Sequence, residues 1–133
     1  MSVRGISIGD LASRTGTNVE TIRYYERVGL MPAPDRTSGN QRRYVSEHVR
    51  RLRFIRHARS LGFPVEAIRE LVGLAAQPER SCAEVDRIAR ENLARIEQRV
   101  RLLRSLDAEL RRMIEACACG SIGECRIIEA LNE

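Results

Sequence analysis

The longest stretch free of helix-breaking residues runs from Cys82 to about Ala116, roughly 35 residues without proline or glycine. Its apolar residues recur every 3.5 positions, the period of a coiled coil rather than of an isolated amphipathic helix. The seam consists of Val85, Ile88, Leu93, Ile96, Val100, Leu103, Leu106, Leu110 and Met113. Such a helix is about 50 Å long, more than the rest of a 133-residue chain can cover. We therefore expect a second copy of the chain to cover the seam; a helix folded back on its own domain is the alternative.

The first part of the chain predicts two short helices joined by a turn. Ser7 is suited to cap a helix over residues 8–14, and Thr17 to cap a second helix over residues 19–28. Gly29 is suited to end the second helix, because glycine adopts the left-handed conformation that follows many helices. This arrangement is typical of a DNA-binding helix-turn-helix.

The residues that follow predict a wing and two supporting helices. Residues 31–41 are rich in turn-forming residues, and residues 42–45 predict a short strand. Ser46 is suited to cap a helix to about residue 61, and a further helix is expected over residues 65–75. The expected fold class is mainly α, a winged helix-turn-helix followed by a long dimerisation helix in an antiparallel coiled coil. We expect a DNA-binding domain at 1–75, a hinge and coiled-coil helix at 76–116, and a cysteine loop with a short terminal helix at 117–133.

Charge is distributed unevenly along the chain. Residues 1–59 hold twelve arginines against five acidic residues, a net charge of +7, whereas residues 60–133 have a net charge of −2. Such a basic first half predicts contact with a polyanion such as DNA; a merely solvated basic surface is the alternative.

The candidate DNA-binding residues lie in the second helix and the wing. Arginine can hold a phosphate or read a guanine edge, and tyrosine can bond a phosphate and pack on a sugar. The candidates are Thr21, Arg23, Tyr24 and Tyr25 in the recognition helix, and Arg36, Arg42 and Arg43 in the wing. Five more arginines line the next helix, where some are expected to pair with acidic side chains: Arg50, Arg51, Arg53, Arg56 and Arg59.

Four cysteines predict a metal site. Cys117, Cys119 and Cys125 fall within nine residues, and Cys82 lies at the start of the long helix. No apolar run is long enough to cross a membrane and the first ten residues do not resemble a signal peptide, so we expect a cytoplasmic protein with reduced thiols. In that compartment such spacing favours metal or redox chemistry. Thiolates select Zn, Cd, Hg, Pb or Cu(I).

Cys82 and Cys117 would be about 50 Å apart in one chain, so they cannot share an ion there. In an antiparallel dimer, Cys82 of one copy would lie beside Cys117 and Cys125 of the other, which would link metal binding to the dimer interface. The sequence contains no glycine-rich phosphate loop, zinc-binding His-Glu pair or nucleophile elbow, so an enzyme is not expected.

Together these motifs resemble the MerR-type transcription regulators, heavy-metal branch, over nearly the whole chain. The segments that carry the resemblance are IGDLASRTG (8–16), TIRYYE (21–26), RRY (42–44), FIRHARSLGF (54–63), SCAEV (81–85) and CACGSIGECRIIEAL (117–131). The resemblance implies a winged-helix homodimer that binds a palindrome in a promoter. With a metal ion bound at Cys82, Cys117 and Cys125, such a protein distorts the DNA so that RNA polymerase can start. Cys119 is a further candidate ligand, extra relative to many members of the family.

The resemblance leaves the metal open. A cysteine at the start of the long helix resembles the divalent-metal sensors, which favours Hg, Cd, Pb or Zn, whereas the eight-residue step from Cys117 to Cys125 is similar to the loop of Cu(I) and Ag(I) sensors. The cysteine spacing is also similar to part of the [2Fe–2S] motif of redox-sensing members, although Ile114 stands where that motif has a further cysteine. Beside a metal-responsive regulator and an iron–sulfur redox regulator, the third possible function is that of a metal-buffering protein that does not regulate genes.

Overall fold

The computed structural model describes residues 5–36, 42–117 and 120–133 and divides the chain into two units, Met1–Ala89 and Arg90–Glu133. It is mainly helical, as predicted. The elements are α1 (Ile8–Thr15), α2 (Val19–Arg27), β1 (Asp35–Arg36), β2 (Arg42–Arg43), α3 (Ser46–Ser60), α4 (Val65–Ala75), α5 (Ala83–Ala116), the 3-10 helix η1 (Ile122–Glu124) and α6 (Arg126–Leu131). Among the described residues no helix is both long and apolar enough to span a membrane.

The two helices of the predicted helix-turn-helix are α1 and α2. The Ser7 hydroxyl accepts the N–H of Asp10, and Gly16 ends α1 in the left-handed conformation, where glycine has no side chain to clash. The predicted cap of α2 is wrong by one residue. The N-cap is Asn18, whose side chain accepts the Thr21 N–H at 2.8 Å. Thr17 still belongs to the closing turn of α1, where its N–H donates to the carbonyl of Ala12.

A two-stranded wing follows α2. β1 and β2 pair antiparallel, and Tyr44 forms an isolated bridge to Ile6. The predicted cap at Ser46 is also wrong, because Ser46 is already the first residue of α3 and Val45 is the N-cap. The Val45 N–H donates to Nδ1 of His48, so a histidine takes the role that glutamate usually has in a capping box.

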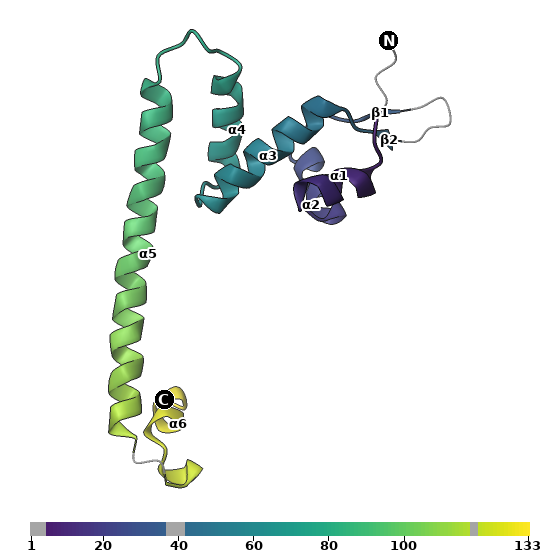
Figure 1. The fold of residues 1–133 in the computed structure, drawn as a ribbon. Helices are drawn as coiled ribbons and strands as arrows, with labels where there is room; N and C mark the ends of the chain where they lie inside the picture. The colour runs from purple at the N-terminus through teal and green to yellow at the C-terminus, as the bar shows by residue number, and fades with distance from the viewer. Residues whose placement is uncertain (1–4, 37–41, 118–119) are drawn as a thin grey trace. The chain divides into compact units, whose positions relative to one another are not determined.

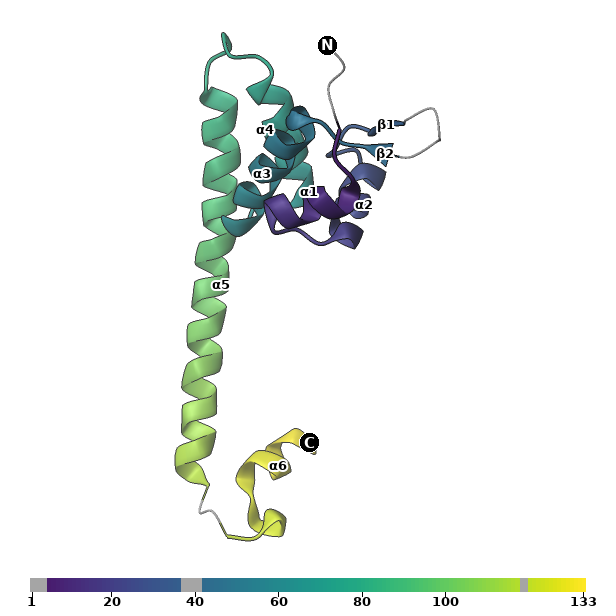
Figure 2. The same cartoon turned by 45° about the vertical axis from the view of Figure 1, so that its right-hand side comes forward.

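One hydrophobic core holds unit 1 together. α1 contacts α2 and α3, and α3 contacts α4 (Figures 1 and 2). The core is formed by Leu11, Ile22, Tyr25, Leu30, Met31, Tyr44, Leu52, Ile55, Ala58 and Ile68. Tyr44 is fully buried, and its hydroxyl donates to the carboxylate of Glu26 at 2.6 Å. This bond joins the base of the wing to α2.

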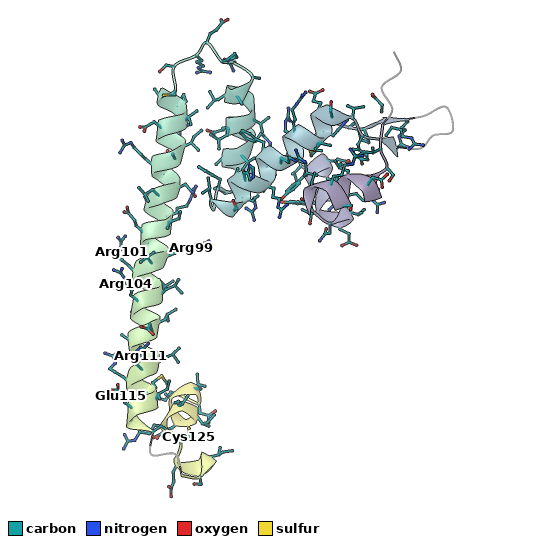
Figure 3. All side chains as sticks on the ribbon, viewed as in Figure 1. Arg99, Arg101, Arg104, Arg111, Glu115 and Cys125 are labelled. Carbon is teal, nitrogen blue, oxygen red and sulfur yellow. The ribbon has the colours of Figure 1, made fainter. Side chains whose placement is uncertain are left out.

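The long helix α5 confirms the predicted continuous segment. In its apolar seam, Ile88 is buried and Met113 is half-buried. The other seam residues are 38–63% exposed. The side chains of Arg99, Arg101, Arg104 and Arg111 are distributed along α5, while Cys125 lies in the segment that follows it (Figure 3). Most of the apolar seam in this chain is therefore uncovered.

Candidate DNA-binding surface and thiol pair

Helix α2, the predicted recognition helix, exposes some of the predicted DNA-binding residues and buries another. Arg23 is exposed, Tyr24 is 41% exposed and Thr21 is half-buried, so these side chains reach the surface of α2. Tyr25 is only 8% exposed and belongs to the core. Two adjacent helical residues point about 100° apart, so only one of the two tyrosines can face solvent fully.

The wing carries its candidate residues on the two paired strands. Asp35 pairs with Arg43 and Arg36 with Arg42. Arg36 is exposed and Arg43 is half-buried. The backbone of Arg42 lies in β2, whereas its side chain and residues 37–41 lie outside the described part of the chain.

Three arginines donate hydrogen bonds to backbone carbonyls at the ends of the two helices of the helix-turn-helix. The sequence did not predict this role for them. Arg56 donates to the carbonyl of Thr15 at the end of α1. Arg51 donates to the carbonyl of Leu30 at 3.0 Å, and Arg69 to that of Val28, both just after α2. Cationic donors are favourable beside the unsatisfied carbonyls of helix C-termini. These arginines therefore serve to hold α1 and α2 against α3 and α4. No local sequence signal identifies them, because their acceptors lie 21 to 41 positions away in the sequence.

In unit 2, Cys117 and Cys125 form a thiol pair. Cys117 directly follows α5, and Cys125 precedes α6, where its carbonyl accepts the N–H of Glu129. Their Sγ atoms are 3.8 Å apart and both residues are half-buried. The glycines at 120 and 123 and the short helix η1 return the chain from the end of α5 to this position.

The backbone around α6 favours the thiolate of Cys125. Its pKa is lowered chiefly by the N–H groups of Ile128 and Ile127 and, to a smaller extent, by the thiol of Cys117, while desolvation opposes the shift. A lowered thiol pKa makes the metal-binding, nucleophilic form available at lower pH.

Cys82 belongs to unit 1. It is exposed and directly precedes α5, where its carbonyl accepts the N–H of Asp86. Cys119 lies outside the described residues. Within the part of the chain that the structure describes, no three Cys, His, Asp or Glu side chains form a group that could hold a metal ion. One chain thus presents the two-thiol pair Cys117–Cys125.

A basic helix-turn-helix with a two-stranded wing, followed by a long helix, defines a DNA-binding regulator. Residues 6–73 match the family described as "MerR HTH family regulatory protein", and residues 49–113 match "MerR, DNA binding". The chain belongs to the MerR family of transcription regulators, which are not enzymes.

Relatives of known identity align with nearly the whole chain. The chain is 42% identical over 130 residues to the HTH-type transcriptional regulator ZntR of Escherichia coli K12, covering 95% of this chain and 92% of that protein. The crystal structure of the regulator PbrR691 from Ralstonia metallidurans CH34 in complex with lead(II) has a TM-score of 0.80 at 35% identity and covers 95% and 98% of the two chains. MerR from Bacillus megaterium MB1, in complex with a mercury(II) ion, has a TM-score of 0.70 at 32% identity and covers 96% and 100%.

Proposed function

We propose that this protein is a metal-responsive transcription regulator whose metal site is shared between the two subunits of an antiparallel dimer. The ligands are Cys117 and Cys125 of one subunit and Cys82 of the other, and the effector is a thiophilic divalent ion, Hg, Cd, Pb or Zn. The 3.8 Å separation of the Cys117 and Cys125 sulfur atoms is the observation that carries the proposal. Structures of two relatives that hold lead(II) and mercury(II) support it.

The dimer is supported by the symmetry of α5. In an antiparallel pair of identical helices, two residues lie opposite each other when their numbers add to a constant. With the constant 199, large apolar residues face each other along α5 in three pairs, and a fourth pair joins a large residue to alanine. The pairs are Ile96 with Leu103, Leu93 with Leu106, Val85 with Ile114, and Ala89 with Leu110. Six of the nine seam residues thus enter apolar pairs about a two-fold axis between Arg99 and Val100, as a C2 interface requires. The other three, Ile88, Val100 and Met113, lie opposite charged side chains in this register.

The same register supports the shared site. Cys82 and Cys117 also add to 199. A second copy therefore brings its Cys82 to the end of α5 where the Cys117–Cys125 pair lies. Cys82 is exposed in the single chain and thus accessible to such a partner.

The thiol pair could hold a soft metal ion, because its two sulfur atoms are in contact but are not bonded to each other. The observed separation is 3.8 Å. A disulfide would require about 2.05 Å. When bound, the ion supplies a soft Lewis-acid centre that joins thiolates of the two subunits; Cys119 remains a candidate fourth ligand.

The DNA interface follows from unit 1. Regulators of this family bind promoter DNA, act with RNA polymerase and are typically dimers. We propose that α2 enters the major groove with Thr21, Arg23 and Tyr24, while Arg36, Arg42 and Arg43 of the wing contact the flanking backbone. Tyr25 supports α2 from within the core. Two such units bind the two halves of a promoter palindrome, and metal binding changes the shape of the bound DNA for RNA polymerase rather than its occupancy.

Subunit mixing tests the shared site. Cys82→Ser in one chain removes the third ligand from both sites of its homodimer, and Cys117→Ser with Cys125→Ser in another chain removes the thiol pair from both sites. A heterodimer of the two contains one complete site, because its intact Cys82 and its intact thiol pair come from different chains. We expect Hg(II) thiolate charge-transfer absorbance to return on mixing, to one ion per heterodimer. No recovery in heterodimers isolated by two affinity tags would refute the shared site.

A Cu(I) sensor is the second candidate, because one chain alone brings two thiols together. In that case Cys82→Ser would leave Cu(I) binding unchanged, and Cu(I) would displace divalent ions from the wild-type protein. Competition titrations of the reduced protein with Hg(II), Cd(II), Pb(II), Zn(II) and Cu(I) distinguish the two candidates.

A further inference from the structure

A basic cavity of about 430 Å³ lies in unit 1 between α1, α3 and the end of the wing. Arg14 of α1 and Arg50 and Arg53 of α3 line it, together with Ser46 and uncharged residues that include Tyr44. Arg50 and Arg53 lie three positions apart, so they share one face of α3. Among the described residues, those that line this cavity include three cations and no carboxylate.

These three arginines differ from the arginines that support the fold. Arg51 and Arg56 of α3 bond carbonyls of the helix-turn-helix. Among residues 5–36, 42–117 and 120–133, Arg14, Arg50 and Arg53 bond no carbonyl and no carboxylate. Three guanidinium groups that line one cavity repel one another unless an anion lies among them. The stability of the fold therefore gives no reason for their arrangement.

The start of α3 adds to the positive potential. Ser46, the first residue of this 15-residue helix, lines the cavity, and its hydroxyl can donate a hydrogen bond. Val45, the N-cap, offers no side-chain oxygen to the N–H groups of the first turn. The N-terminus of a helix favours an anion, and a phosphate in particular.

We propose that this cavity binds a phosphate group through Arg14, Arg50 and Arg53, and that its source is one backbone phosphate of the bound DNA. This inference rests on the proposed DNA-binding function and adds a contact outside the recognition helix and the wing. Arginine forks match the several oxygens of a phosphate. A free phosphate has the same chemistry, so the experiment must separate the two sources.

The salt dependence of DNA binding tests the proposal without knowledge of the operator. Each phosphate contact contributes about 0.9 to the slope of log Kobs against log salt. For a fluorescent 30-base-pair duplex of arbitrary sequence, we expect Arg50→Gln with Arg53→Gln to lower the magnitude of that slope by about 0.9. Between 0.05 and 0.2 M salt, this variant then loses about 3.5-fold less affinity than the wild type. Arg14→Gln, from another helix, should act in the same direction.

Arg101→Gln with Arg104→Gln is the matched control for the double variant, because it also removes two positive charges, from α5 outside the cavity, and should leave the slope unchanged. Unchanged slopes for both cavity variants would overturn DNA as the source of the phosphate. If the wild type then still binds inorganic phosphate and the double variant does not, measured by calorimetry, the cavity takes a free phosphate. If neither readout changes, the site itself is refuted. Failure of the proposed function is a separate outcome, namely a wild type that binds no DNA.

Discussion

Replacing one leucine in the exposed seam of α5 should weaken dimerisation by two equal free-energy contributions, because each residue of a two-fold interface occurs twice. Leu103 is 63% exposed in the single chain. Leu103→Ala removes three carbons, worth about 2.4 kcal/mol on full burial at about 0.8 kcal/mol each. Because 63% of the side chain is exposed in the single chain, about 1.5 kcal/mol of this burial energy is gained only on dimerisation. The loss is therefore about 3 kcal/mol per dimer. We therefore expect the dimer dissociation constant to rise about 100-fold.

Leu102→Ala is the matched control. Leu102 is 59% exposed, almost as much as Leu103, but it lies on another face of α5. In the proposed register it faces Glu97 of the second copy, so its loss should change the dissociation constant less than threefold. Sedimentation equilibrium over a dilution series measures both variants. An equal effect of the two substitutions, or a larger effect of Leu102→Ala, would refute the register.

Three further predictions concern the fold and the thiol pair. Tyr44→Phe removes the buried hydroxyl that donates to Glu26 and should lower the free energy of unfolding by about 1–2 kcal/mol; urea titration measures it, and an unchanged midpoint would contradict the role of that bond. Gly16→Ala should cost about 1–2 kcal/mol in the same assay, because φ is +67° and the new Cβ would lie 2.6 Å from a guanidinium nitrogen of Arg56; a neutral result would argue against the tight approach. The lowered pKa of Cys125 predicts half-maximal alkylation by iodoacetamide below pH 9.0 in the folded protein and a return to the ordinary range in guanidinium. Because the pKa is lower in the folded protein, the thiolate stabilises the fold at pH values above the unfolded pKa. This stabilisation is lost as the pH falls through the folded pKa.

The helices were largely predictable because their start and stop signals are local. Residues 65–75 were predicted as a helix and form α4 (Val65–Ala75), and Gly29 has the left-handed φ expected of a residue that ends a helix. The cap of α2 was missed because Thr17 and Asn18 are both able to cap. The choice between them depends on where the closing turn of α1 ends, and that turn includes Thr17, whose N–H donates to the carbonyl of Ala12.

The sites were less predictable than the helices. Cys117, Cys119 and Cys125 were predicted to belong to a metal site together with Cys82, and the structure describes the sulfur atoms of Cys117 and Cys125 at 3.8 Å from each other. The arginines of α3 look alike in sequence, yet Arg51 bonds a backbone carbonyl while Arg50 lines an open cavity. One helical position, about 100° of rotation, separates the two, and only the packing of α3 against its neighbours determines which side faces the core.

The proposed control of transcription at fixed occupancy sets a quantitative condition on the metal site. A ligand shifts an equilibrium between two shapes only by the difference between its affinities for them. To convert bound DNA from 1% to 99% distorted, the metal must bind the complex with distorted DNA about 10⁴-fold more tightly than the complex with relaxed DNA. A pair of thiols within one subunit gains little from rearrangement of the dimer. In the proposed site, Cys82 comes from the unit of one subunit that contains the helix-turn-helix, and Cys117 and Cys125 come from the other subunit. This site is complete only when the Cys82 of one subunit lies beside the thiol pair of the other. A state that lacks one of the three thiolates binds the metal more weakly than a state that has all three, which is the physical reason to divide the site between subunits.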